Sequence, residues 1–156
     1  SILCIYLDMY IEERVGKSIA EFVDEKGWEA FRLAEWDALH AVVEDQDTRI
    51  RLVATGGGIV LREENRAFMK ETGISIYLNV PKDLLLERYL ADPKHSQRPA
   101  LTNLTVEEET AQVLAERVPL YRAVAATEID GTGTLEESAR QLRTILQEFL
   151  QRTPRN

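Results

Sequence analysis

Short apolar runs alternate with amphipathic stretches along this chain. Runs of strand length and strand composition cover residues 1–7, 50–55, 74–80 and 127–130. Apolar residues at near-helical spacing, bounded by capping signals, predict helices over about 9–15, 18–27, 28–44, 62–72, 82–90, 105–126 and 134–150. Because strands alternate with helices, the pattern predicts an α/β fold with a mostly parallel sheet covered on both faces by helices.

Local signals mark several helix ends. Capping boxes, in which a Ser or Thr precedes a Glu by three residues, begin at Ser18, Thr105 and Thr134. Gly16 breaks the first helical stretch, and Gly73 is expected at the C′ position of the helix before it. Local chemistry thus predicts where most of these helices begin and end.

One polar segment, residues 91–105, has two prolines and no periodicity. Connectors of this length are uncommon in compact domains and are usually functional or disordered. The helix after it contains Pro119, which predicts a kink. Since no repeat or linker interrupts the chain, we expect a single domain over residues 1–156.

Composition narrows the classes of function. The 156 residues are 44% hydrophobic and 29% charged, which is typical of a soluble globular protein and excludes a disordered or collagen-like chain. No apolar run reaches the ~20 residues of a membrane helix, and no signal peptide is evident, so we expect a cytoplasmic protein. The net charge of −8 argues against nucleic acid and anionic membranes as partners.

Cysteine and histidine offer little metal chemistry. Cys4 stands alone, which excludes an intrachain disulfide and a cysteine metal cluster. His40 and His95 are isolated and do not form a histidine metal site by themselves. Chemistry is therefore expected from carboxylates, arginines and backbone groups.

Ligands of open parallel sheets bind beyond the carboxyl ends of the strands. Asp8 follows the first predicted strand, and Gly56, Gly57 and Gly58 follow the second. Successive glycines let the backbone approach a ligand and present N–H groups to it, although a glycine run alone is equally often a flexible turn.

Arginines are the natural partners of an anionic ligand, because the guanidinium donates two parallel hydrogen bonds to a carboxylate or phosphate. Arg32, Arg98 and Arg117 are candidates, although most arginines on helices are solvated. Arg98 stands out because it lies in the long polar segment and precedes Pro99.

Gly16, Lys17 and Ser18 match the end of the phosphate-loop pattern G-x-x-x-x-G-K-[ST]. The first glycine of that pattern would be residue 11, which is Ile11, and the residues before Gly16 read as helix. No other stretch satisfies the pattern, so we reject this match.

Taken together, six segments in order resemble shikimate kinases. They are DMYIEERVGKSIAEF (8–22), EAFRLAE (29–35), VATGGGIVLREENR (53–66), IYLNV (76–80), QRPAL (97–101) and ERVPLY (116–121). The resemblance covers about residues 8–150 and is closest to the bacterial subtype with an extended lid, here residues 91–105. It implies a nucleoside-monophosphate-kinase-like P-loop fold and transfer of the ATP γ-phosphoryl group to the 3-hydroxyl of shikimate, in chorismate and aromatic amino acid biosynthesis.

The resemblance also implies roles for residues on the shikimate side. Asp8 matches the acid that holds the substrate hydroxyls and is a candidate to accept the reacting proton. Arg32, with Glu35 behind it, and Arg117 match arginines that bind the substrate carboxylate. The three glycines, residues 56–58, match the backbone wall of the shikimate site.

On the nucleotide side, Arg88 matches the arginine that packs against adenine. Arg98 matches the lid arginine that closes on the phosphates, which makes it a second candidate catalytic residue. ATP and Mg²⁺ are the implied cofactors, with no residue assigned to the metal. We expect a monomer whose partners are shikimate and ATP.

The chain departs from the family pattern at the phosphate loop, which relatives carry between their first strand and the motif of Asp8. Tyr6 also stands where the first acid of that motif is expected. Our interpretation is that residues 1–7 are the family's first strand and that about 25–30 residues between Leu7 and Asp8 are absent. The alternatives are an inactive ligand-binding or sensor module without the loop and, less favoured, a gluconate-type kinase.

Overall fold

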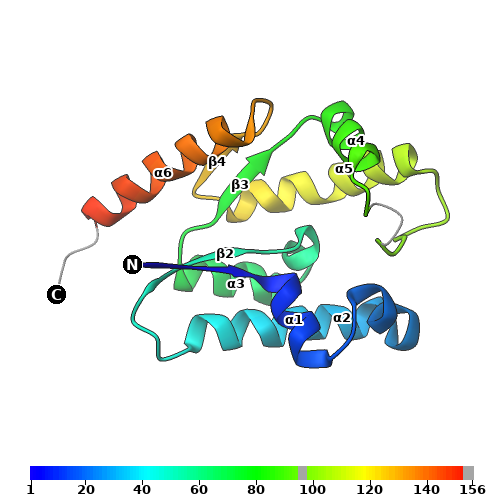
Figure 1. Ribbon diagram of the computed structural model, residues 1–156, viewed down its shortest axis with the longest axis horizontal. Coiled ribbons are helices and arrows are strands. Elements are labelled where there is room, and N and C mark those ends of the chain that lie inside the picture. Colours follow the sequence, from blue (N-terminus) through cyan, green and yellow to red (C-terminus); the bar gives the residue numbers. More distant parts are fainter. Residues whose placement is uncertain (95–97, 153–156) are drawn as a thin grey trace.

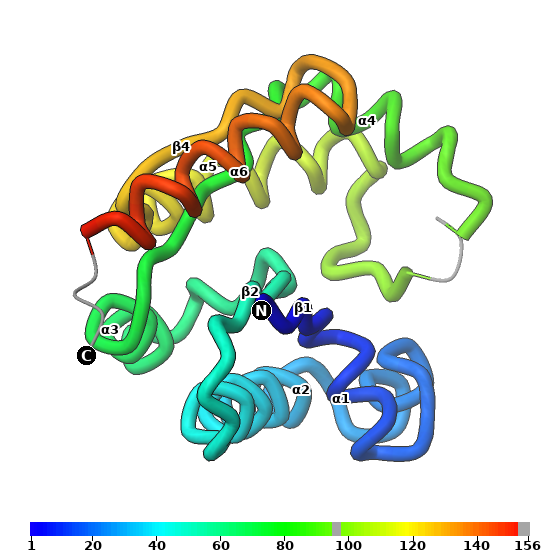
Figure 2. Tube along the Cα trace, turned by 60° about the vertical axis from the view of Figure 1, so that its left-hand side comes forward, coloured from blue at the N-terminus to red at the C-terminus, as the bar shows by residue number. Residues whose placement is uncertain are grey.

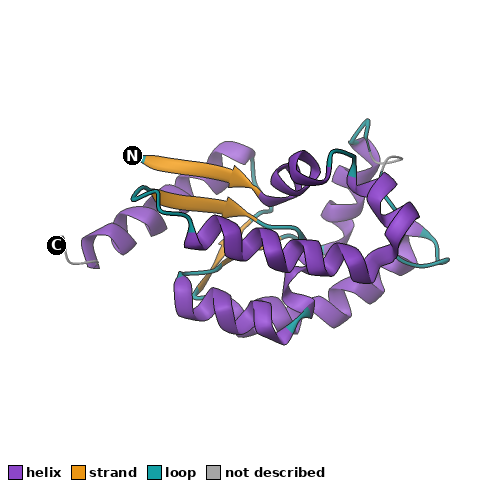
Figure 3. Ribbon diagram, turned by 90° about the horizontal axis from the view of Figure 1, so that it is seen from below, coloured by secondary structure: helices purple, strands orange, loops and turns teal. Residues whose placement is uncertain are grey.

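Two pairs of parallel strands organise the molecule in the computed structural model, which describes residues 1–94 and 98–152 (Figure 1). Strand β1 (Ile2–Tyr6) pairs with β2 (Ile50–Ala54), and β3 (Ile76–Asn79) pairs with β4 (Thr127–Asp130). Within the described residues, the two pairs are separate two-stranded sheets. The prediction of parallel pairing is confirmed, and Figure 3 shows β1 and β2 running side by side in one direction.

Helices connect and flank the strands in the predicted order. They are α1 (Leu7–Val15), α2 (Ile19–Glu44), the 3₁₀ helix η1 (Gly57–Leu61), α3 (Glu63–Thr72), α4 (Lys82–Ala91), α5 (Val106–Val124) and α6 (Leu135–Arg152). None of the helices in the described part of the chain has the length and apolar character needed to cross a membrane.

The molecule consists of two halves. The N-terminal half, residues 1–73, holds β1, α1, α2, β2, η1 and α3, and the C-terminal half, residues 74–152, holds the remaining elements. Figure 2 shows the halves facing each other, with residues 98–105, just before α5, reaching from one towards the other. Helix α5 makes the main contact between them because it packs on η1 and α3.

Most of the buried core lies in the N-terminal half. Its buried side chains are Leu7, Ile11, Phe22, Phe31, Ala38, Leu39, Val42, Ile59 and Val60. They come from α1, α2 and η1, so these three elements form one packed unit. The fold thereby fixes the position of the loop after β2 relative to α2.

The capping predictions are confirmed. Ser18 and Thr105 form complete capping boxes, and Thr134 exchanges hydrogen bonds with Glu137 in the same pattern. Gly16 ends α1 in the left-handed conformation (φ 71°), which a residue without a Cβ adopts at little cost. Capping chemistry is local, which explains why the sequence alone predicts it.

Other boundaries differ from expectation. The stretches predicted as two helices are one element, α2, interrupted at Gly27, whose φ of 83° is not helical. Gly73 caps α3 through a hydrogen bond to Met69 but is extended rather than left-handed. Helix α5 continues through Pro119 to its end at Val124.

The strand predicted over residues 1–7 is confirmed as β1, which runs directly into α1, and Leu7 and Asp8 are consecutive residues of that helix. Leu7 is fully buried in the core of the N-terminal half. The absence of about 25–30 residues between Leu7 and Asp8, relative to the family pattern, stays a prediction. His95 lies outside the described residues.

Candidate active site

Asp8 lies at the end of the β1–β2 sheet beside the glycines that follow β2. A Cβ on Gly56 would lie 3.2 Å from Asp8 Oδ1 and 3.3 Å from Glu35 Oε1. Both carboxyl groups therefore reach the backbone at Gly56, one from the start of α1 and the other from α2. The sequence expectation that Asp8 meets the glycines beyond the strand ends is met.

Arg32 and Glu35 form an ion pair on one face of α2. Arg32 Nη1 donates to Glu35 Oε2 at 2.6 Å, and only 1% of Glu35 is exposed. The Arg32 guanidinium also lies 5.1 Å from the ring centre of Trp28, and it lies against Gly58 so closely that a Cβ there would overlap it. The buried carboxylate and the aromatic ring fix the direction in which this guanidinium points.

Arg117 and Tyr121 approach the glycines from α5. Arg117 is 9% exposed, and its Nε is buried with no hydrogen-bond partner among the described residues. The Tyr121 hydroxyl donates to the Gly57 carbonyl oxygen at 3.0 Å. A Cβ on Gly57 would lie 2.6 Å from that hydroxyl and 3.7 Å from Arg117 Nη1, so only glycine fits here without displacing Tyr121.

We call this group of eight residues the glycine cluster. Its members are Asp8, Arg32, Glu35, Gly56, Gly57, Gly58, Arg117 and Tyr121. Two guanidinium groups and two carboxyl groups surround the backbone of three glycines, of which Gly57 is exposed, at positions that glycine side chains would fill. The guanidinium groups of such a set can bind a carboxylate of a ligand. Asp8 and the backbone can bind the hydroxyl groups of the same ligand.

Burial tunes the acids of the cluster. The pKa of Asp8 is raised, mainly by burial and secondly by the Glu12 carboxylate, while Arg32 opposes the shift. The pKa of Glu35 is also raised, again mainly by burial, with the Arg32 hydrogen bond opposing it. A carboxylate with a raised pKa holds a proton more tightly, which suits Asp8 to accept one from a hydroxyl.

Arg88 lies apart from the glycine cluster. Its Nη2 donates to the Gly133 carbonyl oxygen at 3.1 Å and thereby joins α4 to the loop between β4 and α6. The neighbouring Thr132 lines a cavity of about 320 Å³ beside the ends of β3 and β4. The exposed Arg88 side chain is thus held near a hollow that is distinct from the glycines.

Arg98 does not reach the glycine cluster in this structure. It forms an ion pair with Asp92 at 2.6 Å and lies 5.3 Å from the centre of the Tyr89 ring, while 58% of its side chain is exposed. The structure brings together the predicted shikimate-side residues and leaves both predicted nucleotide-side arginines outside them.

Gly16, Lys17 and Ser18 have structural roles, as the rejected phosphate-loop match implied. Gly16 caps α1, Lys17 Nζ pairs with Glu25 at 2.6 Å, and Ser18 caps α2. These residues form the turn between two helices rather than a loop after a strand.

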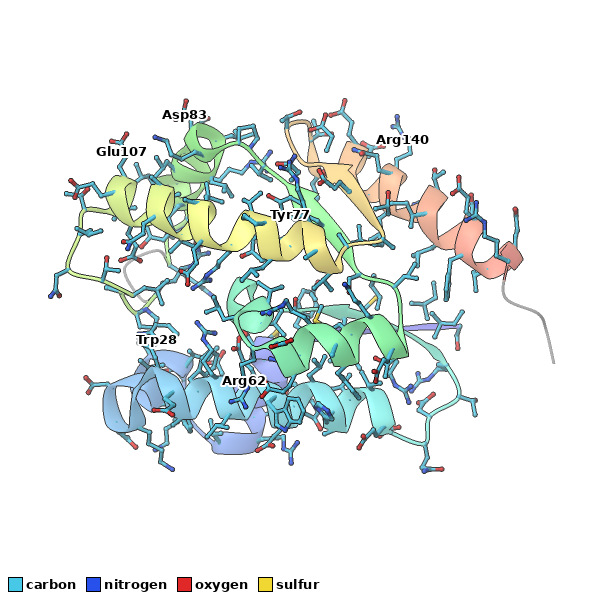
Figure 4. The ribbon with its side chains drawn as sticks, turned by 180° about the vertical axis from the view of Figure 1, so that it is seen from behind. Trp28, Arg62, Tyr77, Asp83, Glu107 and Arg140 are labelled. Carbon is cyan, nitrogen blue, oxygen red and sulfur yellow. The ribbon has the colours of Figure 1, made fainter. Side chains whose placement is uncertain are left out.

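Sequence reasoning missed two residues of the site. Tyr121 belongs to the ERVPLY segment but received no role, although its position one turn after Arg117 places both on one face of α5. Trp28 packs on Arg32, and its Nε1 donates to the Ala100 carbonyl oxygen at 3.4 Å. Figure 4 shows Trp28 between α2 and the segment before α5, a contact that no sequence spacing predicts.

Comparison with known proteins gives a consistent result. The family model for shikimate kinase matches residues 3–151. The chain is 42% identical over 139 residues to shikimate kinase 2 of Enterobacter sp., a match that covers 89% of this chain and 78% of the relative. It is 44% identical over 125 residues to shikimate kinase of Nitratidesulfovibrio vulgaris, covering 80% of this chain and 69% of the relative.

Solved structures agree. Shikimate kinase from Acinetobacter baumannii, solved in complex with shikimate, superimposes with a TM-score of 0.82 at 29% identity. The match covers 98% of this chain and 81% of that one. Shikimate kinase from Bacteroides thetaiotaomicron superimposes with a TM-score of 0.79 at the same 29% identity, covering 94% of this chain and 84% of that one.

Proposed function

This chain belongs to the shikimate kinase family of ATP-dependent kinases, and we propose that the glycine cluster is its shikimate site. The observation that carries the proposal is Arg117, a guanidinium 9% exposed whose Nε has no partner among the described residues. A buried donor left unpaired costs about 1–3 kcal/mol, which an anionic ligand recovers by accepting its hydrogen bond.

The carboxylate of shikimate lies between the two guanidinium groups in this proposal. Arg32 is already oriented by Glu35 and Trp28, so it loses little conformational freedom when the ligand binds. Arg117 supplies the second positive charge from the opposite half of the molecule. Two guanidinium groups from different halves favour a ligand whose planar carboxylate is held in one direction over a ligand that carries only a point charge.

Asp8 accepts the proton of the reacting hydroxyl. The carboxyl group lies beside the Gly56 backbone, and burial has raised its pKa, so its affinity for a proton is higher than that of an exposed aspartate. The glycines let the ring of shikimate approach the backbone, which orients the hydroxyl towards the incoming phosphoryl group.

ATP would supply the phosphoryl group and Mg²⁺ would neutralise charge on its phosphates, and no group of three or more His, Cys, Asp or Glu side chains in the described part of the chain is arranged to hold the metal. Arg88, held on Gly133 beside the 320 Å³ cavity, is the candidate contact for the adenine base. Arg98 is the candidate to neutralise charge on the transferred group, which requires that it exchange its Asp92 partner for a phosphate.

The proposal is tested by titrating shikimate into the chain in a calorimeter and by assaying MgATP-dependent phosphorylation. Shikimate should bind, and the same ring with a hydroxymethyl group in place of the carboxylate should bind at least 10-fold more weakly, as expected for loss of charge-assisted hydrogen bonds. Equal binding of the two ligands would contradict the carboxylate assignment. Phosphorylation of gluconate in preference to shikimate would favour the related sugar-acid kinases, and shikimate binding without phosphorylation would favour a sensor.

A further inference from the structure

Tyr121 joins helix α5 to the glycine run through its hydroxyl, which donates its proton to the Gly57 carbonyl oxygen at 3.0 Å. A Cβ on Gly57 would lie 2.6 Å from that hydroxyl and 3.7 Å from Arg117 Nη1. Tyr121 and Arg117, one turn apart on α5, therefore meet the glycine run at the same point. Because both side chains belong to one helix face, the hydrogen bond from Tyr121 to Gly57 also fixes how closely Arg117 approaches the glycines.

The ring of Tyr121 is held as firmly as its hydroxyl. It stacks on Tyr77 of β3 with ring centres 5.1 Å apart and an interplanar angle of 30°. Figure 4 places Tyr77 beside α5, at the centre of the C-terminal half. Aromatic stacking restricts the two torsions of the tyrosine side chain, so the hydroxyl position follows the position of the C-terminal half.

The hydrogen bond from Tyr121 to Gly57 crosses the boundary between the halves. Gly57 lies after β2 in the N-terminal half, whereas Arg117, Tyr121 and Tyr77 belong to the C-terminal half. The strand pairs of the two halves do not share a sheet in the described residues, so backbone pairing does not fix their separation at this point. The Tyr121 hydrogen bond therefore joins the halves where Arg117 must face Arg32.

We propose that Tyr121 is a positioning residue for substrate binding, which sets the distance between the Arg117 guanidinium and the glycine wall. The inference rests on the proposed function, since it concerns how the same site holds the substrate carboxylate. Tyr121 acts through Arg117 and Gly57 and does not itself bind the carboxylate. A hydroxyl placed only to stabilise the fold would affect unfolding but leave affinity unchanged.

The test is Tyr121→Phe, which keeps the stacked ring and removes the hydrogen bond to Gly57. Shikimate affinity measured by calorimetry should fall by about 3–10-fold, as expected for the loss of one neutral hydrogen bond. Tyr77→Phe is the matched control, because it removes a hydroxyl from the other ring of the same stack. Its affinity should equal that of the unchanged chain.

A double-mutant cycle separates positioning from a direct contact. In an Arg117→Ala background, Tyr121→Phe should lower shikimate affinity by less than about twofold, because the group it positions is gone. An equal loss in both backgrounds overturns the inference, as does an unchanged affinity of Tyr121→Phe alone. If the unchanged chain fails to bind shikimate, the proposed function fails instead.

A second variant disturbs the same hydrogen bond from the Gly57 side and provides an independent test if Tyr121→Phe fails to fold. A methyl group at Gly57 would lie 2.6 Å from the Tyr121 hydroxyl and must displace it. Gly57→Ala should therefore lower affinity, and adding Tyr121→Phe should cause little further loss. Full additivity of the two changes would show that they act on different interactions and would overturn the inference.

Discussion

The arginines on the two sides of this molecule are held in different ways. Arg32 and Arg117 are mostly buried beside the glycines, and Glu35 holds Arg32 in place before any ligand arrives. Arg88 and Arg98 are exposed and bind a backbone carbonyl and a neighbouring aspartate. The proposed shikimate side is therefore prearranged, whereas the two arginines of the proposed nucleotide side would have to change partners to act.

This difference has an energetic reason. A buried guanidinium must be paired or receive a ligand, because its desolvation is otherwise uncompensated, so the surrounding fold fixes its position. An exposed guanidinium stays solvated with either of two partners, so exchanging one partner for another costs little free energy. Binding of the substrate can then depend on the buried arginines, and phosphoryl transfer on the exposed ones.

The largest effect is expected at Arg98. Its charge matters most when phosphoryl charge develops, so in the complete enzyme, with its phosphate loop, Arg98→Ala should lower kcat by on the order of 10²–10³ and leave shikimate affinity nearly unchanged. Arg98→Lys should recover part of the rate, since a point charge does not reproduce a planar fork. Steady-state assays at saturating shikimate with varied ATP measure kcat for both variants. An unaltered kcat would mean that Arg98 does not leave Asp92 for the phosphates and that the comparison between the two sides is wrong.

The next effect concerns the prearranged arginines. Arg117→Ala should weaken shikimate binding by roughly 10–150-fold, the loss of one charge-assisted pair. Arg122→Ala on the same helix is the control, because Arg122 is exposed and pairs with Glu128.

Arg32→Ala should weaken shikimate binding in the same range. Because this change also leaves the buried Glu35 carboxylate without its ion-pair partner, it is best combined with Glu35→Gln. Calorimetry on the folded variants provides the measurement. Unchanged affinity for both arginine variants would remove the basis for placing shikimate here.

A smaller effect should come from filling the glycine wall. Gly58→Ala places a methyl group against the Arg32 guanidinium and should lower shikimate affinity on the order of 10-fold, as moderate overpacking does. Gly73→Ala is the matched control, since nothing lies within 4 Å of a Cβ at Gly73. Equal affinities of the two variants would show that Arg32 moves freely and is not prearranged.

The smallest effect is a pH dependence of stability caused by Asp8. Its pKa is raised above 3.8 in the folded protein, so the folded state binds the proton more tightly than the unfolded state does. The contribution to stability is present below that value and is lost as pH rises through the folded pKa. Asp8→Asn should therefore raise Tm at pH 7, and its advantage should shrink as pH falls towards 4.

Thermal unfolding at both pH values tests this, with the exposed Asp24→Asn as the control. A gain in Tm that does not depend on pH would show that the titration of Asp8 is not its source.

The sequence alone determined the local structure of this protein and most residues of its candidate site. Helix ends at Ser18, Thr105 and Gly16 follow from capping groups a few residues away, so no tertiary information is needed to find them. The motif around Arg32 and the glycine run identified the family, because short segments in a fixed order carry its chemistry.

Only the tertiary structure decided how the parts meet. The strands were predicted as parallel, but their grouping into two separate pairs depends on partners far apart in the chain. Tyr121 reaches Gly57 across 64 positions, and Trp28 reaches Ala100 across 72. Arg98 matches a lid arginine in sequence yet pairs with Asp92 in space. Sequence spacing fixes which residues share a helix face, whereas contacts between faces follow from packing, which depends on the whole chain.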